Sequence, residues 1–190
     1  MRECVNMKKK LEVRNIKVSL FINKPIHIDQ KLQILNPLDS VKITIYKHSP
    51  RLINITGVES FRKLRLVKKF IKYHYCCKIL RERIDSIMLN YKSLKHMKIN
   101  LNRLSKVCEQ IADYNLDYNC EIFNAPFLKS KSEKGTLLLF SSGSIQVMGC
   151  KKIEHIEHNE KLVNTIFSMY KKEVMKERLE MIRERSVGGG

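Results

Sequence analysis

The sequence predicts an α+β fold in which two pseudo-symmetric repeats build one antiparallel sheet, with long helices on a single face. Several short segments alternate apolar and polar residues, which is typical of half-buried strands. Gly57 and Gly149, 92 positions apart, each end such a strand shortly before a long amphipathic helix. A repeat of this size indicates a pseudo-twofold domain, because each half leaves an open sheet that the other completes.

The first half begins with a strand over residues 13–22, where Ile16 and Val18 face one side and Asn15 and Lys17 the other. Its remaining expected elements are a short helix at 29–35, strands at 41–46 and 52–58, a basic helix from Ser60 to about 75, and a helical connection over 76–94. The helix from Ser60 is expected to bury one apolar stripe and to expose its lysines and arginines.

The second half repeats this order. Its expected elements are a strand at 96–102 with Met97, Ile99 and Leu101 inward, a helix at 103–114, strands at 120–129, 136–140 and 144–149, and a helix from about Ile153. The predicted division is a basic N-terminal tail at 1–11, repeats at 12–75 and 95–174 joined by the connection at 76–94, and a charged helical extension with a glycine tail at 175–190.

The charge of the chain points to an anionic partner. The 190 residues include 37 lysines and arginines against 19 acidic residues, a formal net charge of +18. Nucleic acid is the first candidate, and an anionic membrane the second. No run of about 18 apolar residues is present and the first ten residues lack an apolar leader, so we expect an intracellular protein that is neither secreted nor inserted in a membrane.

No motif indicates catalysis or a metal. The six cysteines form no Cys-x-x-Cys pair, and only His155 and His158 among the histidines are close together, on a charged segment. Glycine-rich phosphate loops and a Gly-x-Ser-x-Gly elbow are also missing. We therefore expect reduced thiols, no metal, no cofactor and no enzymatic activity.

One segment resembles a known family. Residues 118–152, YNCEIFNAPFLKSKSEKGTLLLFSSGSIQVMGCKK, are similar without a gap to the C-terminal lobe of the TATA-box-binding protein family, including its Phe-x-Ser-Gly turn. The first half is similar mainly through RNIKVSL and the stretch ending ITG, and the resemblance covers most of residues 12–170. It implies a saddle, a curved antiparallel sheet with long helices on its convex face, which binds the minor groove of A/T-rich double-stranded DNA.

The resemblance also implies roles for individual residues. Phe123 and Phe140 match phenylalanines that wedge between base steps and kink the duplex, and Glu121 matches an acidic position that meets the B-type general transcription factor. The other implied DNA contacts are Asn15 at the centre of the saddle; Asn54, Thr56, Gln146 and Met148 along the groove floor; and Lys129, Lys134, Lys151 and Ser142 at phosphates. Lys17 is a further expected DNA contact, because it lies beside Asn15 on the polar, basic side of the first strand. A minor-groove floor distinguishes mainly A·T from G·C, and an apolar wedge offsets the cost of unstacking.

The sequence departs from the family in its first half, which lacks one strand and any counterpart of Phe123. Tyr46 stands where the second wedge would be, and the following turn reads His48-Ser49-Pro50. The larger Gln146 and Met148 replace the small residues usual on the floor. Taken alone, phenylalanines such as Phe123 and Phe140 are core residues more often than wedges, because exposed phenylalanine is uncommon.

The predicted function is that of a transcription initiation factor that bends DNA and recruits the B-type factor or RNA polymerase machinery, in the nucleus or a viral replication compartment. Two alternatives stay open: a basic architectural protein that coats DNA, and a non-catalytic DNA-binding lobe of a repair or nuclease assembly. The Lys, Ile and Asn bias predicts an AT-rich genome, such as that of a large DNA virus.

Overall fold

The computed structural model describes residues 11–30, 32–91 and 98–187. The N-terminal lobe consists of β1 (Glu12–Ile22), β2 (Leu32–Leu38), β3 (Val41–Tyr46), β4 (Ser49–Val58) and α1 (Phe61–His74). The C-terminal lobe consists of β5 (Ile79–Tyr91), α2 (Leu101–Glu109), β6 (Tyr114–Asp117), β7 (Phe127–Ser130), β8 (Thr136–Leu139), β9 (Ile145–Cys150) and α3 (Glu154–Val187).

These strands form one antiparallel sheet in the order β2-β3-β4-β1-β5-β9-β8-β7-β6. The order is the same in both directions from the central β1–β5 pair, except that β6 has no counterpart beyond β2. The predicted α+β fold of two pseudo-symmetric repeats is therefore confirmed. Within the described residues the N-terminal lobe has one strand fewer, as its sequence predicts.

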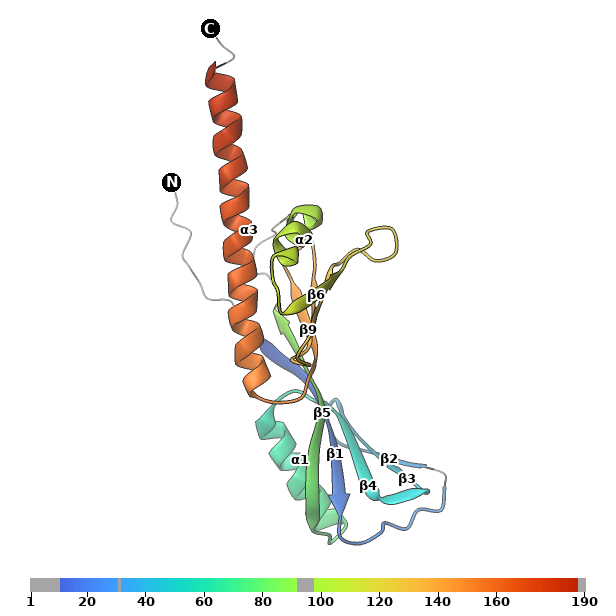
Figure 1. Ribbon diagram of the computed structural model, residues 1–190. Helices are drawn as coiled ribbons and strands as arrows, with labels where there is room; N and C mark the ends of the chain where they lie inside the picture. The colour runs from blue at the N-terminus through green and yellow to red at the C-terminus, as the bar shows by residue number, and fades with distance from the viewer. Residues whose placement is uncertain (1–10, 31, 92–97, 188–190) are drawn as a thin grey trace.

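All three helices lie on the same, convex side of the sheet, and the two lobes curve away from it (Figure 1). In the N-terminal lobe Leu64, Val67 and Ile71 of α1 pack on the sheet, and in the C-terminal lobe Val163, Ile166 and Phe167 of α3 do so. Helix α3 continues well past the sheet, so its C-terminal half stands free of the body (Figure 1). No helix in the described part of the chain has the length and apolarity to cross a membrane.

The two glycines of the repeat each sit in a β-bulge. In the β1–β4 pair the register moves from Ile16↔Val58 to Val18↔Ile55, which leaves an extra residue in β4. The β5–β9 pair makes the same shift between Ile87↔Cys150 and Leu89↔Val147. Gly57 and Gly149 have φ angles of +78° and +79°, a backbone conformation that L side chains rarely adopt. The bulge explains why the repeat ends on glycine twice.

The predicted helical connection at 76–94 is wrong where the structure describes it, because residues 79–91 form β5, the longest strand of the sheet. Residues 92–94 lie outside the described residues. A bulge causes the error: Lys17 pairs with Ser86 but Val18 pairs with Ile84, so Asp85 is an extra residue in β5. The core residues Ile84 and Ile87 are consequently three positions apart, which imitates a helical period.

Other segments also differ from the prediction. The short helix predicted at 29–35 is wrong where the structure describes it: residues 29–30 form a bend, β2 begins at Leu32, and residue 31 lies outside the described residues. The strand expected at 96–102 is absent from the described residues, since 98–100 have no regular structure and Leu101 begins α2; Met97 lies outside them. Helix α2 ends at Glu109, and residues 120–125 form a turn in place of a strand.

Candidate nucleic-acid interface

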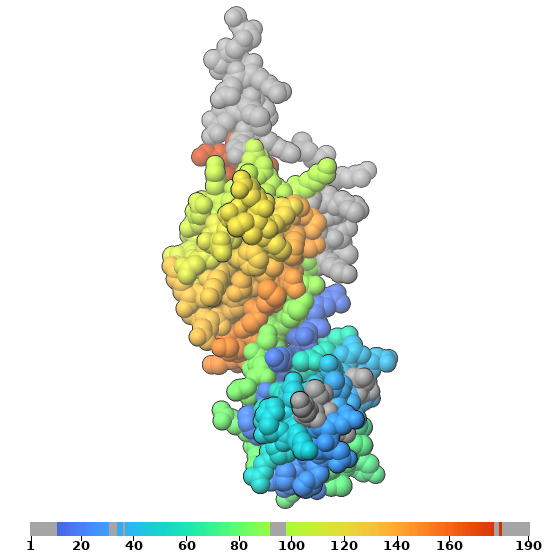
Figure 2. Space-filling model, turned by 90° about the vertical axis from the view of Figure 1, so that its right-hand side faces the viewer, coloured from blue at the N-terminus to red at the C-terminus, as the bar shows by residue number. Residues whose placement is uncertain are grey.

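The open face is the side of the sheet that no helix covers, and Figure 2 looks onto it, with strands of both lobes crossing its middle diagonally. It is formed by the residues that alternate with the core positions of each strand. Several of its large apolar side chains are exposed: Ile34, Tyr46, Phe123 and Met148. A sheet face that leaves several large apolar side chains exposed in both lobes is a candidate binding surface.

Asn15 and Lys17 lie at the centre of the open face, on β1. The Asn15 Oδ1 atom accepts a hydrogen bond of 2.8 Å from the backbone N–H of Gly57, in the β4 bulge. This contact identifies the carbonyl end of the amide and leaves its N–H groups as the end offered to a ligand. Lys17 is exposed and pairs across β5 with Ser86, which is the counterpart of Asn15 in the second repeat.

The N-terminal half of the open face carries a polar network. Ser19, 1% exposed, has its hydroxyl 2.5 Å from Oδ2 of Asp85 and 3.1 Å from Oδ1 of Asn54. Arg83 donates from Nε to Oδ1 of Asp85 at 2.7 Å. Thr56, two residues after Asn54, is half-buried on the same side of β4.

The C-terminal half is more apolar. The rings of Phe123 and Phe127 lie 5.0 Å apart, and Phe127 pairs across the sheet with the buried Leu138, which in turn pairs with Gln146. Phe123 reaches this position because the backbone N–H groups of Ile122 and Phe123 both donate to the carbonyl of Asn119, which closes a turn. Phe123 is 44% exposed, so it is not a core residue.

Tyr46 is the last residue of β3 and Phe140 directly follows β8, and the two occupy equivalent places in the two lobes. Thr44 pairs with Asn54 in one lobe and Leu138 with Gln146 in the other, so the residues two positions later correspond. Phe140 is half-buried at a tight turn in which Gly143 donates to its carbonyl at 2.8 Å. Ser142, exposed in that turn, accepts from the N–H of Ser144 at 3.3 Å.

The candidate phosphate lysines do not all lie on one side. Lys129 is exposed on the open face in β7. It pairs with Thr136 of β8, which in turn pairs with Met148 of β9. Lys151, just after β9, forms an ion pair of 2.9 Å with Glu133. Lys134 lies beside the start of α3, where it lines a pocket of about 460 Å³ together with Lys152, Glu154, His155 and His158.

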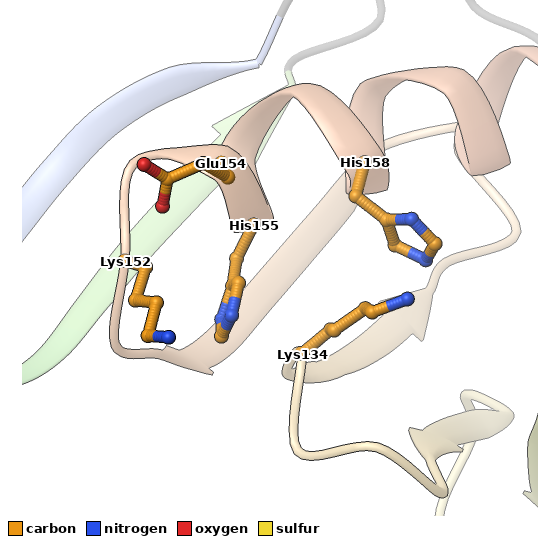
Figure 3. A pocket seen from close by; sticks show the side chains of 5 residues that line it. All are labelled: Lys134, Lys152, Glu154, His155 and His158. Carbon is orange, nitrogen blue, oxygen red and sulfur yellow. The ribbon is translucent and has the colours of Figure 1, made fainter.

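This pocket gathers positive charge at the N-terminus of α3. The Lys134 side chain reaches toward His158, and Lys152 lies near His155 (Figure 3). Burial lowers the pKa of both histidines below its usual value, and the nearby lysines lower it further. The buried Asn159 joins the β7–β8 turn to α3, since its Nδ2 donates to the carbonyls of Lys134 and His155 at 2.8 and 2.7 Å.

Glu121, the candidate partner contact, is exposed in the turn before β7. Its N–H donates to Oδ1 of Asn119 at 3.0 Å, and with Tyr118, Cys120 and Asn102 these residues line a second pocket of about 460 Å³. On the convex side, α1 exposes a separate row of positive residues: Arg62, Arg65, Lys69 and Lys72.

The cysteines in the described residues are all free. Burial raises the pKa of Cys108 to about 12 and that of Cys150 to about 11, so both are packing thiols at neutral pH. Among the described side chains no three of the metal-binding types come together.

Sequence reasoning placed Ser19 on the open side of the first strand but missed three other open-face residues, Asp85, Ser86 and Phe127. Asp85 and Ser86 were hidden because residues 76–94 were expected to be helical. The signal that could have found them is the repeat itself: Asn15 precedes Ile16 in RNIKVSL as Ser86 precedes Ile87 in DSIMLNY.

Comparisons with known proteins agree with this geometry. The model of the family described as transcription factor TFIID, or TATA-binding protein, matches residues 84–170. The TATA-binding protein of Methanococcus jannaschii is similar in structure, with a TM-score of 0.59 and 17% identity, over 84% of this chain and 99% of that one. A Clostridium acetobutylicum aspartate kinase aligns with 8% identity over 83% of this chain and 33% of its own, but its TM-score of 0.26 is too low to support a shared fold.

No curated protein gives a significant match to the chain. The structural likeness spans 84% of the chain, whereas the family model matches only the C-terminal lobe, from within β5 to residue 170 in α3. The chain thus has the fold of the TATA-binding protein, and its residues 84–170 match the sequence model of that family.

Proposed function

We propose that this chain is a TATA-binding-protein-like DNA-binding factor, which lays its open face in the minor groove of A/T-rich duplex DNA and bends it. The observation that carries the proposal is the open face itself. It is wide, curved and uncovered, and it joins exposed apolar side chains such as Phe123 and Met148 to lysines such as Lys17 and Lys129. Apolar contact with sugars and base edges, together with phosphate neutralisation, is what such a surface offers.

The centre of the open face suits the hydrogen-bond pattern of A·T pairs. Their minor groove presents only the acceptors N3 of adenine and O2 of thymine. Asn15, whose carbonyl is held by Gly57, would present its N–H groups to these acceptors. Asn54, Thr56 and Gln146 lie on the same face and would contact the groove floor on either side of Asn15.

The duplex would be bent by the aromatic rings at the edges of the open face, which would insert between base steps. Partial unstacking of a base step costs a few kcal/mol, which an inserted ring offsets by burying its area and by letting the bent duplex contact more protein. Phe123 is exposed and its ring contacts that of Phe127, and Phe140 directly follows β8. Tyr46, at the position equivalent to Phe140, would act in the N-terminal lobe.

The phosphate contacts would come from the lysines and the turn at the rim. Lys129 and Ser142 are exposed there, and Lys151 is held by Glu133 close to the pocket of Lys134. The proposed role is in transcription initiation. The B-type factor or the polymerase machinery would bind near the exposed Glu121. Such a factor would act in the nucleus or in a viral replication compartment.

The test is selection of bound sequences from a random duplex pool, followed by energy transfer between dyes at the two ends of the best duplex. We expect an A/T-rich consensus and a shorter end-to-end distance in the complex. Failure to retain any duplex at low salt, where phosphate contacts are strongest, would contradict the proposal.

A second candidate function rests on α1. The exposed residues Arg62, Arg65, Lys69 and Lys72 belong to α1, which lies on the convex side of the sheet (Figure 1). They give the molecule a second positive surface, which a duplex on the open face would not contact. A protein that coats DNA would use both surfaces. Selection from the pool separates the two functions, because a coating protein would return no consensus.

A further inference from the structure

Asp85 places a carboxylate on the open face, at the centre of the sheet. It is the bulged residue of β5 in the β1–β5 pair, and its carboxylate meets Ser19 and Arg83, which both point to the open face. Its side chain is 17% exposed, so it is sheltered but reachable. The nearby Asn54 contacts the same Ser19 hydroxyl, which places Asp85 on the N-terminal-lobe side of the centre.

A carboxylate is an unexpected group for a surface that faces only A·T pairs. Ionised Asp accepts hydrogen bonds and donates none, while the A·T minor groove also presents acceptors alone. One group in the minor groove does suit a carboxylate: the N2 amino group of guanine, which donates a hydrogen bond. We propose that Asp85 accepts a hydrogen bond from the N2 amino group of a guanine, so that the preferred site carries a G·C pair on the N-terminal-lobe side of its centre. This inference rests on the proposed minor-groove function.

Asp85 has capacity left for such a bond. The Ser19 hydroxyl uses one lone pair of Oδ2 and the Arg83 guanidinium uses one of Oδ1, whereas a carboxylate offers about four sites. The two contacts also fix the carboxylate in place, so little side-chain freedom is lost when a base binds. Arg83 offsets part of the negative charge that approaching phosphates would otherwise meet.

The pseudo-twofold symmetry makes the inference specific to one side. Counting back from the paired residues Ile16 and Ile87, Arg14 occupies the position equivalent to Asp85, and both are bulged residues. Their ion-pair partners are exchanged as well: Arg14 pairs with Glu12 at 3.1 Å, as Asp85 pairs with Arg83. An arginine donates and suits the acceptors of A·T pairs, so no second G·C pair is expected at the symmetric position.

The test uses duplexes that differ in a single N2 amino group. G·C pairs are first scanned one position at a time through an A/T-rich duplex that the protein binds. At the preferred position the G·C pair is then replaced by inosine·C, which removes the amino group, and by diaminopurine·T, which adds it to an A·T-like pair. We expect the duplexes with the amino group to bind about 10-fold more tightly than those without it.

The protein side of the test compares two variants of β5. Asp85→Asn should reduce the preference for the amino group to within about twofold, since an amide presents both a donor and an acceptor. Glu82→Gln is the matched control: Glu82 lies on the convex side of the same strand, 2.6 Å from Lys68, and its loss should leave the preference unchanged. Thermal melts verify that both variants fold.

Two results would overturn the inference: equal binding of G·C and inosine·C at every position, or a preference that survives in Asp85→Asn. Both leave duplex binding intact, and they would make Asp85 a residue that only orients Ser19 and Asn54. Loss of binding to all duplexes would instead refute the proposed function, and with it this inference. The inosine comparison needs no variant, so it stands even if a substitution at Asp85 unfolds the protein.

Discussion

Phenylalanine side chains lie on both sides of the sheet. Their exposure distinguishes the rings proposed to contact DNA from those buried in the core. Phe123 is 44% exposed and Phe140 half-buried on the open face, whereas Phe167 of α3 is 4% exposed in the core. For Phe123→Ala with Phe140→Ala we expect a loss of less than about 1.5 kcal/mol of unfolding free energy per ring, because neither is fully buried. The same double variant should bind straighter DNA, measured by end-to-end energy transfer.

The matched control for this pair is Phe167→Ala, which should cost about 3–5 kcal/mol and lower the melting temperature sharply. A comparable collapse in the double variant would mean that the two open-face rings hold the fold together. Fully bent DNA bound to a stable double variant would instead move the bending role to Tyr46 or to the rim lysines.

Asn15 allows its structural and ligand-binding roles to be measured separately. Asn15→Asp keeps an oxygen that accepts from Gly57 but removes the N–H groups, so unfolding free energy should change little while duplex affinity falls about 10-fold or more. Asn15→Ala leaves the Gly57 N–H unpaired and should lower the unfolding free energy by about 1–3 kcal/mol. Urea denaturation measures the unfolding free energy, and a duplex titration measures the affinity. If the affinity of Asn15→Asp is unchanged, Asn15 does not contact the DNA.

Among the elements, the two glycine bulges provide a matched pair of sites. Both backbones need a positive φ, which costs an alanine about 1–2 kcal/mol. A Cβ at Gly149 would meet nothing within 4 Å, but one at Gly57 would lie 1.7 Å from the carbonyl oxygen of Ser40. We therefore expect Gly149→Ala to lose only the conformational cost and Gly57→Ala to lose several kcal/mol in urea denaturation. Equal losses would contradict the close packing of β4 on the β2–β3 turn.

The start of α3 gives the fold a dependence on pH. The pKa of His155 and His158 is lowered in the folded chain, so below about pH 6.5 the unfolded chain takes up protons that the folded chain does not. Stability is therefore complete above the unfolded pKa and decreases as the pH falls toward the folded value. In a variant carrying His155→Gln and His158→Gln, the melting temperature should fall less between pH 7 and pH 5 than it does in the parent chain. If the melting temperature of the variant depends on pH as strongly as that of the parent, these histidines are not the cause of the pH dependence.

The elements that the sequence predicts well are those with an unbroken period. Residues 41–46 alternate strictly and form β3 with the predicted bounds, and Ser60 caps α1 by accepting from the N–H of Lys63 at 3.1 Å. Bulges and turns explain the failures. An extra residue at Asp85 changes the phase of β5, and the turn closed by the Asn119 carbonyl interrupts a segment whose composition favours a strand.

Alternation along the first strand predicted that Asn15 and Lys17 lie on the open face, but the aromatic positions of the candidate site depended on the resemblance. Phe123, Phe140 and Tyr46 could be placed because turns of fixed spacing hold them. The position of Lys134 beside α3 could not be predicted in this way. A lysine in a turn can point to either face of a sheet, and the packing of α3 decides which. Asp85 needed the strand register, which depends on pairing between residues about 70 positions apart.

For the whole molecule, the net charge of +18 has a measurable effect on association. Each phosphate neutralised in the saddle releases condensed counterions, so the logarithm of the duplex affinity should fall against the logarithm of salt concentration with a slope of about −0.9 per contact. Titrations between low and physiological salt measure this slope. Lys129→Gln should make it less steep by about one unit, and a flat dependence in the parent chain would argue against phosphate contacts altogether.

The length of α3 has a mechanical consequence. With Tyr170 as the last of its residues packed against the core cluster, the part up to Val187 is an arm of about 25 Å at 1.5 Å per residue. A rigid arm amplifies small rotations: a tilt of the body by about 10° sweeps the tip through about 4 Å. A rotation of the sheet beneath α3 would therefore displace the C-terminal end of the helix by several ångströms, at a point far from the sheet.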